Sequence, residues 1–212
     1  MSDPRQGGIA ILDFGSQYTQ LIARRVREQG VYAEVFPHDV DSETALRHAP
    51  RGFIFSGGPN SVYEADAPQI PVWFWQRPAP ALGICYGMQA LTHGLGGTVA
   101  PAQAREYGQA VIEPTAPSLL LDGLEPPIDV WMSHGDRIEQ PPPGFVTLAA
   151  SHNSPYAAMG DVARHYYGVQ FHPEVAHTPL GGRILHNFLF KICGCVAAWS
   201  PIAFIEDAVE SI

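Results

Sequence analysis

The stretch PALGICYGMQALTHGLGG, residues 80–97, joins a short apolar run to a helix-like pattern, and a cysteine stands at the corner between them. Cys85 lies between Gly83 and Gly87 in the pattern G-x-C-x-G. The serine version of this pattern places a nucleophile on a strained strand-to-helix turn. The N–H groups of the following helix would favour a thiolate there. The stretch therefore indicates either a catalytic thiol or a small buried cysteine at a strand–helix junction.

Strand-like and helix-like segments alternate on both sides of this corner. Apolar runs that read as strands occupy residues 8–15, 31–37, 51–59 and 79–84. Residues 16–30 carry apolar side chains at helical spacing. Residues 41–50 resemble a short helix capped by Asp41 or Ser42. This alternation predicts an α/β fold, in which helices flank a mostly parallel central sheet.

The pattern changes after Gly97. Four strand-like runs follow without long helices between them, at residues 107–114, 127–136, 145–151 and 165–174. They predict either an extension of the sheet or an added antiparallel layer. Residues 181–193 then read as a helix with an apolar stripe made of Ile184, Leu185, Phe188, Leu189 and Ile192. We expect one domain over residues 1–198.

Composition limits the class of protein. The formal net charge of −9 argues against binding a nucleic-acid backbone. No apolar run approaches the roughly 20 residues of a membrane span, and the first residues lack an apolar signal core. Three cysteines do not suggest a disulfide framework, so reduced thiols are the simpler interpretation. We expect a cytoplasmic protein that binds neither nucleic acid nor membrane.

A catalytic cysteine needs a base and a group that orients the base. The triplet His172-Pro173-Glu174 follows the apolar run at residues 166–171 and offers both. Pro173 disfavours a helical conformation for the residue before it, and in an extended segment residues two apart point to the same side. We expect Glu174 to hold the imidazole of His172 near Cys85. An ordinary turn with a surface acid is the alternative.

Negative charge on a carbonyl oxygen also needs N–H donors. The backbone N–H of Tyr86, directly after the cysteine, is one candidate for such an oxyanion hole. The loop Ser56-Gly57-Gly58-Pro59 offers a second, which we assign to Gly58 because glycine lets the backbone approach a substrate closely. The loop is not a phosphate-binding P-loop, because no Lys-Ser or Lys-Thr follows it.

Taken together, these motifs resemble the class I glutamine amidotransferases. The resemblance lies in SGGP, GICYGMQ and HPE, at residues 56–59, 83–89 and 172–174. Within that family the chain is most similar to the glutaminase domains of GMP synthetases, as judged from residues 11–28, 105–108, 130–136 and 168–178. The resemblance implies a flavodoxin-like class I amidotransferase fold with an added antiparallel strand region.

The resemblance also implies a reaction. Glutamine would be hydrolysed to glutamate and ammonia through a glutamyl thioester on Cys85, with His172 as acid and base and Glu174 as its orienting group. Gln89, one helical turn beyond the cysteine, would hydrogen-bond the substrate, although a solvent-facing helix residue is the alternative.

The remaining implications concern the substrate backbone and the partner. The backbone around Ser133 and Gly135 would bind the α-amino and carboxylate groups of glutamine. The glutaminase step needs no cofactor or metal. ATP and Mg²⁺ would belong to a synthetase (ATP-pyrophosphatase) domain that uses the ammonia to convert XMP to GMP. That domain is absent from this chain, and residues 199–212 read as the start of a linker helix toward it.

Two other functions stay open at this point. The chain is compatible with a γ-glutamyl peptidase-like cysteine hydrolase, or with a non-catalytic binding domain that keeps the triad. A metal held by His172, Glu174 and His177 is disfavoured, because neither pair has the i, i+4 spacing of a zinc-binding helix and Pro173 prevents a helix there. His134 and Asp136 are expected in a turn, where they would shape the pocket or face the partner domain.

Overall fold

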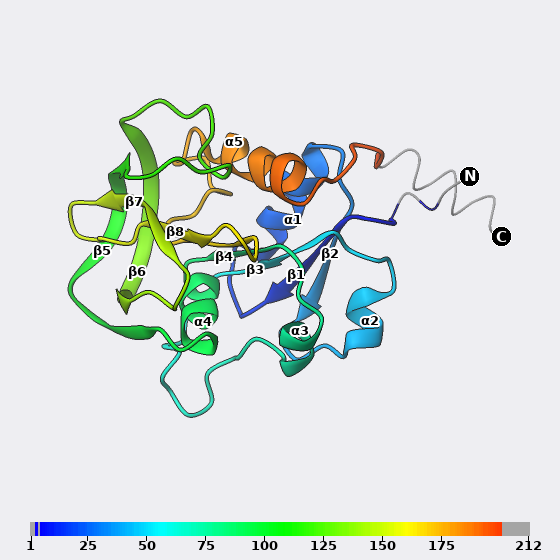
Figure 1. The fold of residues 1–212 in the computed structure, drawn as a ribbon, viewed down its shortest axis with the longest axis horizontal. Helices are drawn as coiled ribbons and strands as arrows, with labels where there is room; N and C mark the ends of the chain where they lie inside the picture. Colours follow the sequence, from blue (N-terminus) through cyan, green and yellow to red (C-terminus); the bar gives the residue numbers. More distant parts are fainter. Residues whose placement is uncertain (1–2, 4, 201–212) are drawn as a thin grey trace.

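A computed structural model describes residues 3 and 5–200, apart from the side chains of residues 103–105. Of the linker helix expected over residues 199–212, residues 201–212 lie outside the described residues. The described chain forms a nine-stranded sheet in the order β2-β1-β3-β4-β9-β8-β7-β5-β6. Figure 1 shows helices on both faces of its parallel part.

The parallel half agrees with the predicted alternation of strands and helices. Its strands are β1 Ile9–Asp13, β2 Ala33–Pro37, β3 Gly52–Phe55, β4 Ala81–Ile84 and β9 Tyr166–Val169. The helices between them are α1 Thr19–Glu28, α2 Ser42–Leu46, α3 Val72–Gln76 and α4 Tyr86–Gly94. Asp41 caps α2, because its carboxylate accepts a hydrogen bond from the backbone N–H of Thr44 at 2.9 Å.

The antiparallel half extends this sheet and does not form a second layer. It consists of β5 Thr98–Pro114, β6 Ile128–Gln140, β7 Val146–Ser151 and β8 Ala158–Asp161. β9 joins the two halves, because it pairs parallel to β4 and antiparallel to β8. The sequence predictions missed β8 and α3, which have only four and five residues and therefore show little periodicity.

The helices bury two apolar clusters, one on each face of the sheet. On one face, α1 packs with the last helix, α5 Gly181–His186, which continues as the π-helix η1 Asn187–Ile192 (Figure 1). The predicted stripe along α5 and η1 is buried in this cluster. Aromatic side chains dominate the opposite cluster, including Phe53, Phe55 and Phe74. Burial of one such side chain contributes about 1.5–3 kcal/mol.

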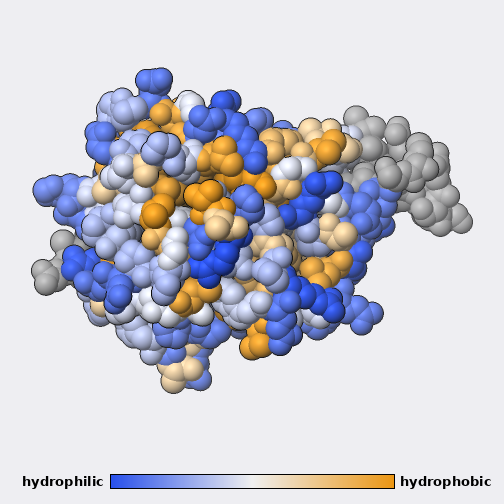
Figure 2. Space-filling model, in the orientation of Figure 1, coloured by the Kyte–Doolittle hydropathy of each residue, from blue (hydrophilic) through white to orange (hydrophobic). Residues whose placement is uncertain are grey.

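Figure 2 shows a face on which hydrophobic areas lie among hydrophilic ones. None of the helices within residues 5–200 is long and apolar enough to span a membrane.

The junction between β4 and α4 leaves no room for side chains on the two glycines of the G-x-C-x-G pattern. A Cβ atom on Gly87 would collide with the backbone carbonyl of Phe55 at the end of β3. A Cβ atom on Gly83 would collide with the first turn of α4. Both glycines are therefore required by close packing of the helix against the sheet.

We predict that Gly87→Ala lowers the free energy of unfolding by about 1–3 kcal/mol, because β3 must move to admit the methyl group. Urea denaturation monitored by circular dichroism measures this change. Gly182→Ala in α5 is the matched control, since a methyl group on Gly182 would have no heavy atom within 4 Å. Equal stability of the two variants would contradict the packing argument.

Candidate functional site

Cys85 lies at the carboxyl end of β4, on the turn into α4. Its backbone has φ 52° and ψ −109°, a region that residues other than glycine rarely adopt. Its N–H donates to the carbonyl of Val169 on β9 at 2.8 Å, and its carbonyl accepts from the N–H groups of Met88 and Gln89. These bonds hold the strained conformation, as expected for a nucleophile that must project from the turn.

His172 and Glu174 contact each other after β9, as predicted, although Pro173 and Glu174 lie in a turn and not in the expected extended segment. Nδ1 of His172 lies 2.7 Å from Oε1 of Glu174, and both side chains are buried. The N–H of His172 donates to Trp131 on β6, and its carbonyl accepts from the hydroxyl of Thr178. The backbone is thus fixed on both sides of the imidazole.

The surroundings of His172 favour its protonated form. Burial lowers the pKa of this imidazole, but hydrogen bonds to Cys85 and Glu174 outweigh burial and raise the pKa to about 10. The folded chain therefore gains stability from protonated His172 below pH 6.5, and this stability is lost as the pH rises through about 10. An imidazolium beside the sulfur stabilises a thiolate at neutral pH.

A cavity of about 550 Å³ opens at Cys85. The predicted substrate-site and oxyanion-hole residues all line it, namely Gly58, Tyr86, Gln89, Ser133 and Gly135. The Sγ atom of Cys85 donates to the carbonyl of Ser133 at 3.5 Å. Segments from both halves of the sheet therefore meet around one thiol.

Gly58 approaches the site through its backbone. A Cβ atom there would collide with the carbonyl of Phe14 and press against the ring of Tyr86. The absence of a side chain lets the loop after β3 lie close to the start of α4. The role of the Gly58 and Tyr86 N–H groups as oxyanion donors stays a prediction.

Gln89 does not face solvent, which was the alternative considered for it. Its side chain is 3 % exposed, and its Nε2 atom donates to the carbonyl of Asp136 at 3.3 Å. This bond links α4 to β6 across the cavity. The position agrees with a substrate contact, which stays a prediction.

The expectation that His134 and Asp136 lie in a turn is wrong, because both belong to β6. Paired strands continue through this region, and Glu106 of β5 stands opposite His134 in the register. Nε2 of His134 lies 3.3 Å from the Glu106 carboxylate, while the hydroxyl of Tyr63 donates to Asp136. Burial lowers the pKa of His134 despite this carboxylate. Residues 105–108 belong to β5.

His177 takes no part in the arrangement around Cys85. Its ring packs against Trp131 with centroids 4.5 Å apart. Within residues 3 and 5–200, no three His, Cys, Asp or Glu side chains are grouped so as to hold a metal ion.

Two residues near the site were not selected from the sequence. The ring of Tyr18 packs edge-on against His172, with centroids 5.5 Å apart. The side-chain amide of Gln170 lies beside the sulfur of Cys85. Both lie in segments that carry the family resemblance, residues 11–28 and 168–178, but neither was assigned a role. Gln170 is an uncharged polar residue inside the apolar run before His172, and this position was the available signal.

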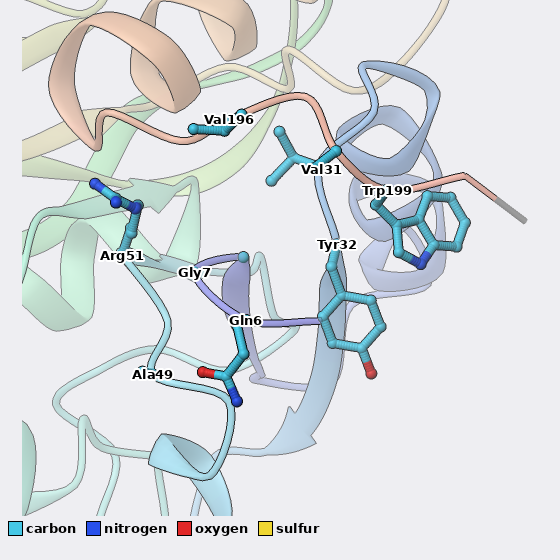
Figure 3. A pocket seen from close by; sticks show the side chains of 10 residues that line it. Gln6, Gly7, Val31, Tyr32, Ala49, Arg51, Val196 and Trp199 are labelled. Carbon is cyan, nitrogen blue, oxygen red and sulfur yellow. The ribbon is translucent and has the colours of Figure 1, made fainter. Parts of the chain in front are cut away.

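A second cavity, of about 410 Å³, lies at the opposite end of the parallel strands. Figure 3 shows Tyr32, Trp199 and Arg51 among the side chains around it. No cysteine or histidine among the described residues lines it, whereas Cys85 and His134 line the first cavity, and the thiol of Cys85 contacts the imidazole of His172. The chemistry of the described residues therefore points to the Cys85 cavity.

Comparisons of the sequence with known proteins show its family. Residues 10–192 match the family model of the class-I glutamine amidotransferases. The chain is 58 % identical, over its whole length, to a GMP synthase [glutamine-hydrolyzing] of Thermomicrobium roseum. It is 52 % identical, over 96 % of its length, to the protein of that name from Pseudomonas syringae. The chain spans about 40 % of the length of each of these relatives.

Solved structures show the same fold. A putative GMP synthase component from Thermoplasma acidophilum superimposes with a TM-score of 0.79 at 28 % identity, covering 98 % of both chains. A glutamine amidotransferase from Thermotoga maritima gives a TM-score of 0.72 at 16 % identity, covering 89 % of this chain and 99 % of that one. The second likeness concerns the fold alone.

We predict that Glu174→Gln lowers the pKa of His172 by about 1–3 pH units, because the carboxylate that favours the imidazolium is removed. Titration of the imidazole by ¹⁵N NMR measures the change. Glu106→Gln is the control, since Glu106 contacts His134 and has no hydrogen bond to His172. A His172 titration that is identical in the wild type and Glu174→Gln would rule out this account of the charged imidazole.

Proposed function

Because the chain belongs to the class-I glutamine amidotransferase family, we propose that it hydrolyses the side-chain amide of glutamine to glutamate and ammonia. One observation carries this proposal: a cysteine on a strained turn lies beside a histidine that a buried carboxylate holds at 2.7 Å. Nucleophile, base and orienting group are the parts that acyl transfer by a thiol requires.

In the first half of the proposed reaction, the thiolate of Cys85 attacks the amide carbon of glutamine. Negative charge develops on the amide oxygen, and the backbone N–H groups of Gly58 and Tyr86 donate to it. The imidazolium of His172 then gives its proton to the amine as the carbon–nitrogen bond breaks. Ammonia leaves, and a glutamyl thioester remains on the sulfur.

In the second half, neutral His172 takes a proton from water, and the resulting hydroxide attacks the thioester. A second oxyanion forms in the same place and collapses to release glutamate and the thiolate. Glu174 holds the imidazole in one tautomer through both halves, because its carboxylate engages Nδ1 and leaves Nε2 for the reacting groups.

The walls of the cavity offer polar groups for the α-amino and α-carboxylate groups of glutamine. The backbone at Ser133 and Gly135 offers polar groups for the α-amino and carboxylate groups, and Gln89 stands across from them. A γ-glutamyl peptidase would use the same thiol chemistry. The names of the relatives favour free glutamine as the substrate.

We further propose that the ammonia serves the amination of XMP to GMP by a synthetase domain. The relatives that are named GMP synthases are about two and a half times as long as this chain, because the chain spans about 40 % of each. In this proposal ATP and Mg²⁺ act in the synthetase domain, and the glutaminase step uses protein groups alone.

We predict that Cys85→Ala abolishes ammonia release from glutamine, because the nucleophile is lost while the fold is kept. A glutamate dehydrogenase-coupled assay measures ammonia, and circular dichroism checks folding. Glutamine and γ-glutamyl peptides are tested in parallel with the wild type. Ammonia release by the purified, folded variant above a contamination control would refute the proposed mechanism, whereas hydrolysis of the peptides alone would identify the peptidase.

We also predict that the synthetase part accelerates this chain. A displacement of about 1 Å in His172 or Gly58 costs on the order of 100-fold in rate, so a partner that favours the competent arrangement has a large effect. Glutamate production is measured after addition of a separately expressed synthetase domain with ATP, Mg²⁺ and XMP, and without XMP as control. Unchanged turnover at saturating partner, with binding shown independently, would contradict activation.

A further inference from the structure

Gln170 stands next to Cys85 because of the register between two parallel strands. Ile84, the last residue of β4, pairs with Val169, the last residue of β9. Cys85 and Gln170 are the next residue of each strand. The N–H of Cys85 donates to Val169 at 2.8 Å, and the N–H of Gln170 donates to Ala157 at 2.8 Å. The backbone of both residues is thus fixed by the sheet.

The side chain of Gln170 has an unusual environment. It is fully buried, its Nε2 atom lies 3.9 Å from the sulfur of Cys85, and its Oε1 atom has no hydrogen-bond partner among the described residues. Burial of a primary amide is unfavourable unless it forms hydrogen bonds. The sulfur of Cys85 is the one acceptor that the structure gives this amide among the described residues. If the amide only filled space, an apolar side chain would do so at a lower cost in free energy.

We propose that Gln170 is a catalytic residue of the hydrolysis proposed above, on which this inference rests: its amide N–H donates to the sulfur of Cys85 whenever the sulfur is negatively charged. A neutral thiol accepts only weakly, and the 3.9 Å separation of Nε2 from the sulfur leaves room for the bond to shorten. A thiolate accepts more strongly, because hydrogen bonds to charged groups are shorter and stronger. The amide thereby favours the thiolate before attack and again when the thioester is hydrolysed.

The role of this donor differs from that of His172. The imidazole accepts and returns the proton and is charged in the resting site. The amide of Gln170 carries no proton that leaves at neutral pH, so it stabilises the thiolate without competing for the proton. Its rigid position also means that little reorganisation is needed when charge appears on the sulfur.

The test is the pH dependence of the alkylation of Cys85 by iodoacetamide, measured without glutamine by mass spectrometry of the modified peptide. Gln170→Met keeps the length of the side chain and removes the donor. We expect the midpoint of its alkylation profile to rise by about one pH unit, and kcat for glutamine to fall about tenfold with a smaller change in KM. Gln170→Glu places an acid beside the sulfur and is expected to raise the midpoint further.

Asn187→Leu is the matched control. Asn187 is another fully buried amide with an unpartnered oxygen, and its amide donates to Leu120 and Asp122 far from the thiol in the chain. This variant removes a buried amide without changing the surroundings of Cys85, so its alkylation midpoint should equal that of the wild type. Cys85→Ala gives the background from the other two cysteines.

The outcomes distinguish a hydrogen-bond donor from a side chain that only fills space. They also distinguish failure of this inference from failure of the proposed function. If folded Gln170→Met keeps the wild-type midpoint, the amide only fills space and the proposal is overturned. If Gln170→Met does not fold, Gln170→Leu, which also removes the donor without adding a charge, decides in the same way. If the wild type hydrolyses no glutamine but the midpoint still rises in the Gln170 variants, the thiolate contact stands and the proposed function fails.

Discussion

The site depends on the lack of space at the turn between β4 and α4. The helix packs so closely on the end of the sheet that Gly87 touches the backbone of β3 and Gly83 touches the first turn of the helix. The chain can make this approach only if Cys85 adopts a positive φ, at a cost of about 1–3 kcal/mol. The burial of apolar side chains on both faces of the sheet offsets this cost.

The second determinant of the site is the position of β9 at the change from parallel to antiparallel pairing. β9 lies beside β4, although about eighty residues separate them in the chain. Its carboxyl end therefore delivers Gln170, His172 and Glu174 to the side of the thiol. The antiparallel strands beyond it bring β6 over the same edge, so that Ser133 and Gly135 form the far wall of the cavity.

The charge of each histidine near the site depends on the groups that contact it. A buried histidine alone would be neutral, because burial lowers its pKa, as it does for His134. His172 behaves in the opposite way because the thiol and a buried carboxylate both contact its ring. Two histidines with similar burial thus hold different charges, and the difference follows from the partners that the fold supplies.

The sequence by itself determined the local features: the glycine-flanked cysteine, the apolar stripe of the last helix and the strand–helix alternation of the α/β class. It also predicted the contact between His172 and Glu174 and, from it, a Cys-His-Glu triad. These follow from steric rules and periodicities that act over a few residues. Only the tertiary structure decided that the late strands extend the same sheet, that His134 lies in β6, and that Gln89 and Gln170 are buried. Those facts depend on contacts between strands distant in the chain, whose pairing and register no local pattern specifies.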